Sequence, residues 1–318
     1  MVSRGRRFGR AGICSGQPHT NLARLYSDGS VDGSFPGAAG GPVYALALQA
    51  DNAILAGGAF GSLDGQLRDG LARLFHDGRL DATFNPGGGG VYALAVQADG
   101  KILVGGVFSM LAGQVRAGIG RINSDGTLDT TFNPGAGATI SSGFYTLAVQ
   151  ADGRILVGGN FRYSVPTPGG PSVNDLGRLN SDGTFDLTFK PVVGGSVQCL
   201  ALQPDGKAVV GGNFSSLGSQ ARHSIGRLNS TYPAIHSLGR AGPTFNWLTG
   251  GTGPEVWRVA FEVSTDGVDW SNVGSGTRVP AGWTMDASDI PPGATARVRG
   301  FISDSGISGS FVEDWLFQ

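Results

Sequence analysis

The sequence is poor in the residues on which several functional classes depend. It has only two cysteines, Cys14 and Cys199, in unrelated contexts, so free thiols are expected rather than a disulfide framework. Three lysines and a net charge of −1 argue against a nucleic-acid surface or a polybasic membrane patch. No apolar run approaches the roughly 20 residues of a membrane-spanning helix, so membrane insertion is not expected.

Glutamate is scarce as well. Three glutamates stand against 21 aspartates, and 56 of the 318 residues are glycine. Aspartate and glycine form turns, whereas glutamate favours helices. The composition therefore predicts short strands joined by tight turns, in a chain long enough for two domains. The stretch 1–16 is basic but has no apolar core, so it does not predict a signal peptide.

The abundant feature is one repeated block of about fifty residues. Aligned copies begin at Leu22, Leu71, Ile119 and Leu176, and a fifth begins at Ile225 but then loses the pattern. The segment 8–25 aligns with 60–74, so it looks like the tail of an earlier repeat. Self-similarity at this period predicts a stacked or radial array, in which the residues that recur in every copy build the scaffold.

Each block contains two predicted hairpins. In the second copy the first hairpin is 91–97 and 101–106, joined by the tight-turn pair Asp99-Gly100. The same hairpin recurs at 43–58, 144–159 and 197–212. Both faces of these strands are apolar, which predicts sheets that are covered on both sides. Cys199 stands in one such strand, so we expect it to be a small core residue.

The second hairpin carries a repeated ion pair. In the third copy a turn at Ser124-Asp125-Gly126 places Arg121 opposite Asp129. The same spacing predicts four cross-strand pairs: Arg24 with Asp32, Arg73 with Asp81, Arg121 with Asp129, and Arg178 with Asp186. Each pair is expected to fix strand register and to contribute roughly 0.2–1 kcal/mol. Four strands per repeat, without a helical period, predict the blade of a β-propeller.

These motifs resemble those of the bacterial delta-60 repeat family of β-propellers. The run Leu/Ile-Ala/Gly-Arg-Leu/Ile-x-x-Asp-Gly, the run Ala-Leu-Ala-Leu/Val-Gln-x-Asp-Gly and the run Gly-Gly-x-Phe recur in register over 8–230. The resemblance implies an all-β propeller of four-stranded blades. It supplies no catalytic residues to carry over, because the family is largely uncharacterised.

The composition changes near residue 230. All five tryptophans and all three glutamates lie beyond it, whereas all three lysines lie before it. We therefore predict propeller repeats over 1–230 and a second domain over 231–318. About six short candidate strands in the second domain suit a small β-sandwich. The stretch 261–301 resembles part of a fibronectin type III or related immunoglobulin-like domain.

The number of blades stays open between four and five. The first half-repeat of the chain could pair with the last one and close a ring, as propellers often do. An open or truncated array is the other possibility.

Most polar residues of the chain have a structural explanation. Asn123, Asp125 and Asp129 faintly resemble a calcium loop, but a hairpin turn plus a register pair explains them, so no cofactor or metal is expected. Glu255, Glu262, Glu313 and Asp314 lie outside the repeat, and we expect them to be surface charges. The tryptophans are expected to anchor a core, and the alternative is that one of them serves a binding face.

The best positional candidate for recognition is an insert in the third blade, 162–175, which lengthens one loop. Loop variation on a rigid scaffold is where recognition usually resides. The candidate binding residues are Arg162, Tyr163, Asn174 and Asp175.

Three functional hypotheses remain, and no catalytic constellation is found for any of them. The first is a non-enzymatic binding or scaffold protein, monomeric, secreted or at the cell surface, with an unidentified protein or glycan as partner. The second is a propeller-type carbohydrate-active enzyme, a hydrolase or lyase. The third is an intracellular interaction scaffold, which free cysteines would suit.

Overall fold

The structure is a computed structural model that describes residues 12–14, 17–19, 21–135, 139–141, 143–165, 170–230, 232–290, 293–302 and 311–316. Its regular elements are β-strands, and every pairing between them in these ranges is antiparallel. The all-β prediction is therefore confirmed. No helix in the described ranges is long and apolar enough to cross a membrane.

Four successive sheets, called blades 1 to 4 below, follow the repeat. Blade 1 contains β3 (Val43–Leu48), β4 (Ile54–Gly58) and β7 (Leu71–Leu74), and blade 2 contains β8 (Gly90–Val96), β9 (Ile102–Val107) and β12 (Ile119–Ile122). Blade 3 contains β13 (Thr139–Ser141), β14 (Phe144–Val149), β15 (Ile155–Ser164) and β16 (Ser172–Leu179). Blade 4 contains β17 (Val193–Leu202), β18 (Ala208–Leu217), β19 (Gln220–Ala221) and β20 (Ile225–Leu228).

Short outer hairpins complete the array. They are β1 (Gly12–Cys14) with β2 (Gln17–His19), β5 (Ser62–Leu63) with β6 (Gln66–Leu67), and β10 (Met110–Leu111) with β11 (Gln114–Val115). In blades 1 to 3 the predicted fourth strand shrinks to one β-bridge: Leu74 with Leu80, Ile122 with Leu128, and Leu179 with Phe185. It is short because an Asp-Gly turn is followed after only a few residues by a second turn at the repeated aspartate.

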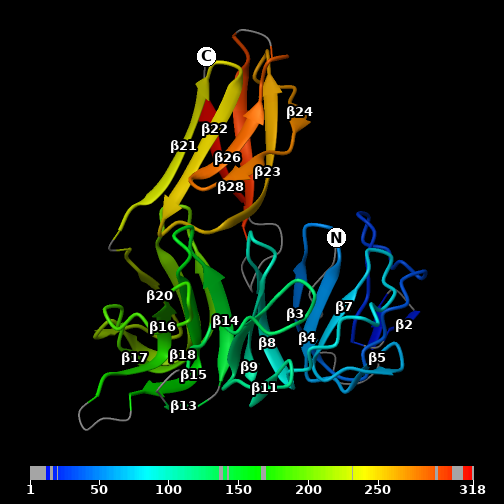
Figure 1. The fold of residues 1–318 in the computed structure, drawn as a ribbon, viewed down its shortest axis with the longest axis vertical. Helices are drawn as coiled ribbons and strands as arrows, with labels where there is room; N and C mark the ends of the chain where they lie inside the picture. The colour runs from blue at the N-terminus through cyan, green and yellow to red at the C-terminus, as the bar shows by residue number, and fades with distance from the viewer. Residues whose placement is uncertain are drawn as a thin grey trace.

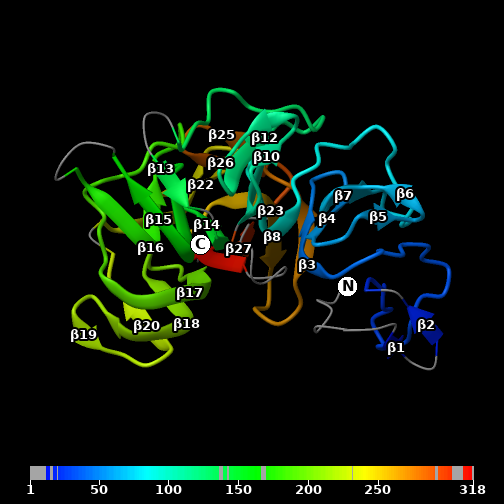
Figure 2. The ribbon, with the colours of Figure 1, turned by 90° about the horizontal axis from the view of Figure 1, so that it is seen from below.

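The blades stand side by side and form an open arc (Figure 2), with the N-terminal strands at one end and blade 4 at the other. The innermost strands β3, β8, β14 and β17 contact one another in that order. Tyr44 stacks on Tyr92 with ring centroids 4.7 Å apart, and Tyr92 meets Tyr145 edge-on at 5.4 Å. In the described ranges no strand pairing joins the two ends of the arc, so the pairing of first and last half-repeats is not seen there.

The hairpin over residues 22–35, called the N-terminal half-repeat below, instead packs on blade 1. Leu25 bridges Val31 within its own hairpin. Leu22 and Phe35 from this hairpin share a core with Ile54, Phe60 and other residues of blade 1. The half-repeat therefore covers the outer part of blade 1 rather than completing blade 4.

The joint between neighbouring blades depends on a glycine. A Cβ placed on Gly57 of blade 1 would lie 2.6 Å from Cγ1 of Val91 and 3.1 Å from Cδ1 of Leu94, both in blade 2. Such distances leave no room for a side chain. The glycine therefore forms the hollow that receives the next blade.

Cys199 does not lie in the core, contrary to the sequence prediction. It is an exposed free thiol, although its counterparts Ala45, Ala93 and Thr146 are buried. The reason is its position in blade 4, where no further blade of the described chain covers that face of the sheet.

The last part of the chain forms two four-stranded antiparallel sheets (Figure 1). One contains β21 (Ala234–Ala241), β22 (Thr244–Gly251), β26 (Gly282–Asp286) and β25 (Thr277–Val279). The other contains β24 (Ser271–Gly274), β23 (Val256–Ser264), β27 (Thr295–Ile302) and β28 (Phe311–Leu316). Both contribute to one core that includes Trp247, Phe245 and Phe261. These sheets stand at one end of the blades, above blades 3 and 4 in Figure 1.

Candidate functional site

Each complete copy of the repeat builds the same polar cluster around its aspartate. In blade 2, Nε of Arg121 donates to Oδ2 of Asp129 at 2.8 Å, and the Arg121 guanidinium lies 4.7 Å above the Phe132 ring. Thr131 donates to the other carboxylate oxygen from its backbone N–H at 3.0 Å and its hydroxyl at 2.6 Å. The equivalent ion pairs are Arg24 with Asp32, Arg73 with Asp81, and Arg178 with Asp186. All four pairs thus lie where the sequence predicts them.

The same arginines also tie each blade to the next, which the sequence did not predict. Nη1 of the arginine donates to a turn carbonyl in the following copy: Arg24 to His76 at 2.7 Å, Arg73 to Ser124 at 2.5 Å, and Arg121 to Ser181 at 2.9 Å. A guanidinium can do this because it carries five donors in a rigid plane. Each recurring arginine is therefore an inter-blade link as well as a register pair.

The recurring aspartates stay ionised because of these contacts. Burial alone would raise the pKa of Asp129, but hydrogen bonds from Thr131, Lys101 and Arg121 outweigh it and hold that pKa well below its usual range. Lys101 lies 2.9 Å from the same carboxylate. Protein cations therefore neutralise Asp129, one of the three residues of the faint calcium pattern. In the described ranges no group of three or more His, Cys, Asp or Glu could hold a metal ion.

The insert of the third blade is largely strand rather than loop. Arg162 pairs with Asn174, and Tyr163 with Val173, as β15 and β16 extend outward; residues 166–169 lie outside the described part. Tyr163 is only 8% exposed, and its ring stacks on Phe185 at 4.1 Å. It packs against the core because Phe185 comes from the repeat's own turn beneath it. Little of the ring is therefore open to a ligand, and its role as a ligand contact stays a prediction. Arg162 and Asn174 are exposed, and Asp175 is half-buried.

The C-terminal sheets attach to blade 3 by adding a short strand to the end of β14. The backbone N–H of Ala151 donates to Gly253 at 2.8 Å, and that of Glu255 donates to Val149 at 2.8 Å. Gln150 and Pro254 form an antiparallel bridge between these bonds. Main-chain pairing of this kind holds two parts of a chain together through geometry rather than side-chain identity.

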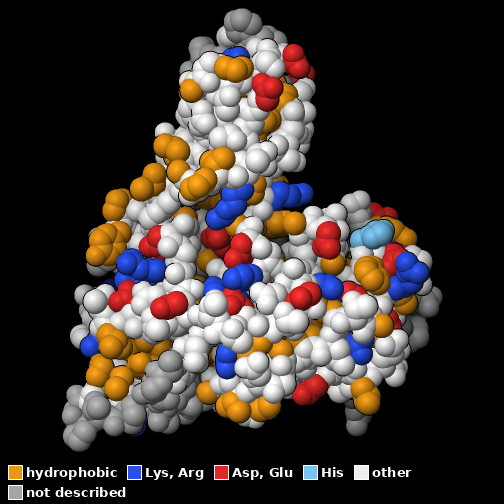
Figure 3. All heavy atoms as spheres, viewed as in Figure 1, with side chains coloured by type: hydrophobic (Ala, Val, Ile, Leu, Met, Phe, Trp, Pro, Cys, Tyr) orange, Lys and Arg blue, Asp and Glu red, His pale blue; other side chains and the backbone are white. Residues whose placement is uncertain are grey.

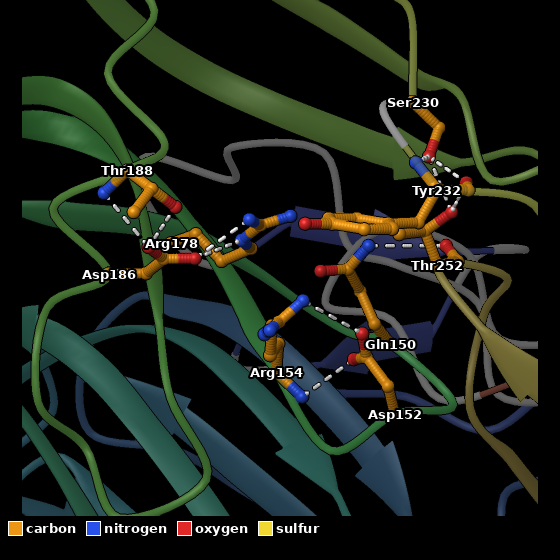
Figure 4. A network of polar contacts seen from close by, with 9 residues as sticks. All are labelled: Gln150, Asp152, Arg154, Arg178, Asp186, Thr188, Ser230, Tyr232 and Thr252. Atoms are coloured by element: carbon orange, nitrogen blue, oxygen red, sulfur yellow. Dashed lines mark hydrogen bonds and ion pairs between the residues drawn. The ribbon is translucent and has the colours of Figure 1, made fainter.

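Side chains surround this attachment, as Figure 4 shows. Nε2 of Gln150 donates to the Thr252 carbonyl at 3.2 Å, and the Thr252 hydroxyl donates to the Tyr232 carbonyl at 2.6 Å. Arg178 faces this network and bonds Asp186. In the described chain, no hydrogen bond links Arg178 to Ser230, the fifth-copy counterpart of His76, Ser124 and Ser181. The C-terminal attachment thus takes the place of the fourth inter-blade link.

Glu255 is a buried carboxyl in this attachment, not the surface charge that the sequence predicts. Burial raises its pKa to about 7, against the opposing attraction of Arg278. Burial wins because Arg278 lies at 3.4 Å with a half-exposed side chain. One carboxylate oxygen, Oε2, has no hydrogen-bond partner. The sequence gives no signal of this burial, since Glu255 is solvent-shielded only when β14 meets the segment before β23.

A second group of polar and aromatic side chains comes from β23, β27, β28 and the residue before β24. Trp315 is 42% exposed and meets Trp270 edge-on at 5.0 Å. The Arg297 guanidinium lies 4.0 Å above the Trp270 ring and bonds Glu262 at 2.5 Å. Trp247 and Trp283, in contrast, are buried. We call the group of Glu262, Arg297, Trp270 and Trp315 the tryptophan row.

Comparison with known families identifies the repeat. The family model described as "Domain of unknown function (DUF5122) beta-propeller" matches residues 9–35, 49–84, 97–132, 150–189 and 203–231. These matches together cover more than half of the chain and coincide with the repeated turns and strands above. No curated protein matches the chain. On the strength of the family match, the chain belongs to the DUF5122 β-propeller family.

Proposed function

We propose that this chain is a non-enzymatic binding and scaffold protein, acting outside the cell or at its surface, with a glycan or a protein as ligand. The observation that carries the proposal is the tryptophan row. A half-exposed tryptophan braced edge-on by a second one, with charged groups beside it, suits contact with sugar rings or with an apolar anchor of a partner.

The links between successive blades support this proposal, because they hold the blades in fixed positions. The recurring arginines and aspartates are engaged in holding blade to blade, with link distances of 2.5 to 2.9 Å. Their charges are thus used for structure, and a stiff array suits the presentation of contact surfaces. The exposed side chains of the insert, Arg162 and Asn174, offer a second contact surface on blade 3.

We further propose that the repeats are of the delta-60 type over 1–230. For 231–318 we propose a fibronectin type III or immunoglobulin-like sandwich. What supports the second assignment is that two four-stranded antiparallel sheets contribute to one shared core.

A carbohydrate-active enzyme is the competing function, and Glu255 is the observation that favours it. A carboxyl with a pKa raised to about 7 by burial is typical of a general acid. Against it, the cavity beside Glu255 holds about 20 Å³, which is room for a single water molecule and not for a sugar ring.

A glycan array probed with the whole chain tests both functions. We expect the wild-type protein to bind a subset of the immobilised glycans and the Trp315→Ala variant to lose that binding. The Asn174→Ala variant is the matched control for a surface remote from the tryptophan row. Release of reducing sugar from a retained glycan, abolished by Glu255→Gln, would overturn the proposal in favour of the enzyme.

A further inference from the structure

The last blade has a sheet face that the rest of the described chain leaves uncovered. Ile225 in β20 is 65% exposed, whereas Leu71, Ile119 and Leu176 at the same repeat position are 0%, 1% and 1% exposed. Those three residues are buried because a further blade stands against them. Figure 3 shows hydrophobic side chains gathered at the edge of the molecule where β20 leads into β21.

The uncovered face has two rows of residues across β17, β18 and β20. The strand register places Cys199, Gly211 and Ile225 in one row and Ala201, Val209 and Arg227 in the next. We call these six residues the terminal face. Their counterparts in blade 2, which blade 3 covers, are all buried: Ala93, Gly105, Ile119, Ala95, Leu103 and Arg121. The terminal face is therefore a blade joint without its second half.

The joints inside the array show what fits such a face. The hollow at Gly158 receives Val197 of the next blade, since a Cβ on Gly158 would lie 2.5 Å from Cγ1 of Val197. Val91 fills the hollow at Gly57 in the same way. In these two joints a β-branched side chain enters the glycine hollow, and at the joint between blades 2 and 3 Leu147 stands in the same place, 3.3 Å from a Cβ on Gly105. Each joint thus has the close packing of an interior.

At the terminal face the hollow and a side chain that would fill it lie next to each other. A Cβ on Gly211 would meet only atoms of its own blade, Sγ of Cys199 at 2.8 Å and the Ser224 carbonyl at 3.8 Å. Ile225, which is β-branched, is the direct neighbour of Gly211 on the next strand. A surface with a hollow and a matching projection side by side is complementary to a second copy of itself.

We propose that two copies of this chain associate through the terminal face about a two-fold axis, with Ile225 of each copy entering the hollow at Gly211 of the other. A two-fold joint uses the same patch on both copies, and packing of one sheet face on another is the ordinary way to cover such a patch. This inference does not depend on the proposed binding function, and it replaces the monomer that the sequence suggested.

A head-to-tail joint, with blade 1 of the second copy on the terminal face, is disfavoured by the N-terminal half-repeat. That hairpin already covers the outer part of the blade 1 face that points away from blade 2, which is the face a second copy would have to contact. Arg24 donates to the His76 carbonyl, and Phe35 lies against Gly78. Strand β20 of another copy would need the same place, so among the described strands of blade 1 the inner strand β3 is the part left for such a joint.

The oligomeric state of matched variants tests the proposal. Light scattering coupled to size exclusion, from about 1 to about 200 µM chain, is expected to show a monomer–dimer equilibrium for the wild type. Ile225→Asp is expected to raise the dissociation constant by about tenfold or more, because it replaces the apolar side chain that enters the Gly211 hollow with a carboxylate that would lose its hydration there. Leu67→Asp, at an exposed apolar position of the outer hairpin of blade 1, is expected to leave the constant unchanged.

A further variant separates the two modes of association. Leu48→Asp changes an exposed leucine at the end of β3, so it would disrupt a head-to-tail joint but not a two-fold one. Loss of association in Leu48→Asp would overturn the proposal. A wild-type protein that stays monomeric over the whole concentration range would overturn it too.

Thiol labelling supplies a second measurement that does not depend on size. In a Cys14→Ser background, Cys199 is the remaining thiol, and maleimide should label it more slowly as the chain concentration rises. The Cys14→Ser/Ile225→Asp variant should label at one rate throughout, with circular dichroism showing that both variants are folded. Labelling of the Cys14→Ser protein that is independent of concentration would contradict association through the terminal face.

Discussion

Arg121 of blade 2 donates a hydrogen bond of 2.9 Å to the carbonyl of Ser181, which lies sixty residues further along the chain in the turn of the next copy. The same guanidinium bonds Asp129 within its own hairpin. One side chain therefore sets the register of a hairpin and the position of the neighbouring blade. Three successive copies share this arrangement, so the array is linked along its length by repeated polar contacts.

Replacing Arg121 with lysine should destabilise the array although the charge is kept. A single ammonium cannot reach the Asp129 carboxylate and the Ser181 carbonyl in the geometry of a planar guanidinium. We expect the free energy of unfolding in urea to fall by about 1–3 kcal/mol, because buried hydrogen-bond partners lose their donor.

The matched control for that substitution is Arg79→Lys. Arg79 forms an exposed ion pair with Asp77, so its replacement should change the free energy by less than about 0.5 kcal/mol. Equal free energies of unfolding for the Arg121→Lys and Arg79→Lys proteins would show that the inter-blade hydrogen bond does not contribute to stability.

Gly57→Ala should disturb the joint between blades 1 and 2. The added methyl group would lie 2.6 Å from Cγ1 of Val91, and overpacking of this kind costs about 1–3 kcal/mol. Gly61→Ala is the control, because a Cβ there would meet nothing within 4 Å.

The double variant Gly57→Ala/Val91→Ala should recover part of the loss, since the smaller side chain at 91 makes room for the new methyl group. Chemical denaturation of the wild type, Gly57→Ala, Val91→Ala and the double variant measures the coupling free energy between the two positions. A strictly additive result would contradict direct packing of Val91 into the Gly57 hollow.

Glu255 should make the attachment of the C-terminal sheets sensitive to pH. Its pKa is about 7 in the folded chain, against an ordinary value of 4.5 for a glutamate in the unfolded chain. The folded state therefore binds this proton more tightly than the unfolded state. This group's contribution to stability should be greatest below pH 4.5 and should be lost as the pH rises through 7, by up to about 3 kcal/mol in total.

Glu255→Gln should remove that pH dependence and should be more stable than the wild type at pH 8. Tryptophan fluorescence measures it well, because all five tryptophans lie beyond residue 230. If the wild type and Glu255→Gln keep the same stability difference between pH 5 and pH 8, the buried carboxyl does not titrate as described.

The insert of blade 3 should respond differently at its two kinds of position. Tyr163→Ala removes a ring that is packed against Phe185 and should lower the free energy of unfolding by about 2–4 kcal/mol. Asn174→Ala changes an exposed side chain and should have an effect below about 0.5 kcal/mol. Thermal melting of both variants checks this, and a neutral Tyr163→Ala would favour Tyr163 as a ligand contact.

Much of the local structure could be predicted because it is local. The Asp-Gly turns, the strands on either side of them and the pairing of Arg121 with Asp129 depend on residues within one hairpin. Their repetition in four copies made the pattern visible despite variation at single positions. The link from Arg121 to Ser181 was missed because neither the spacing nor the residue type of a carbonyl acceptor marks it in a sequence.

The errors lie where the repeat ends. Cys199 and Ile225 occupy positions that are buried in the other copies, so the pattern predicts burial, but burial also requires a neighbour. Glu255 shows the converse, since it looks like a surface charge and is buried by contact with a distant strand. For the candidate site, the sequence singled out the tryptophans as a class but could not distinguish exposed Trp315 from buried Trp247.

The sequence by itself determined the all-β class, the blade unit and its internal register, since these follow from turn chemistry and alternation within about fifty residues. Only the tertiary structure decided that the described strands form an open arc, that blade 4 exposes Cys199 and Ile225, and that the C-terminal sheets bind the end of β14. The reason is physical: turns and strand pairs are fixed by neighbours in the chain, whereas burial is fixed by whatever stands opposite in space.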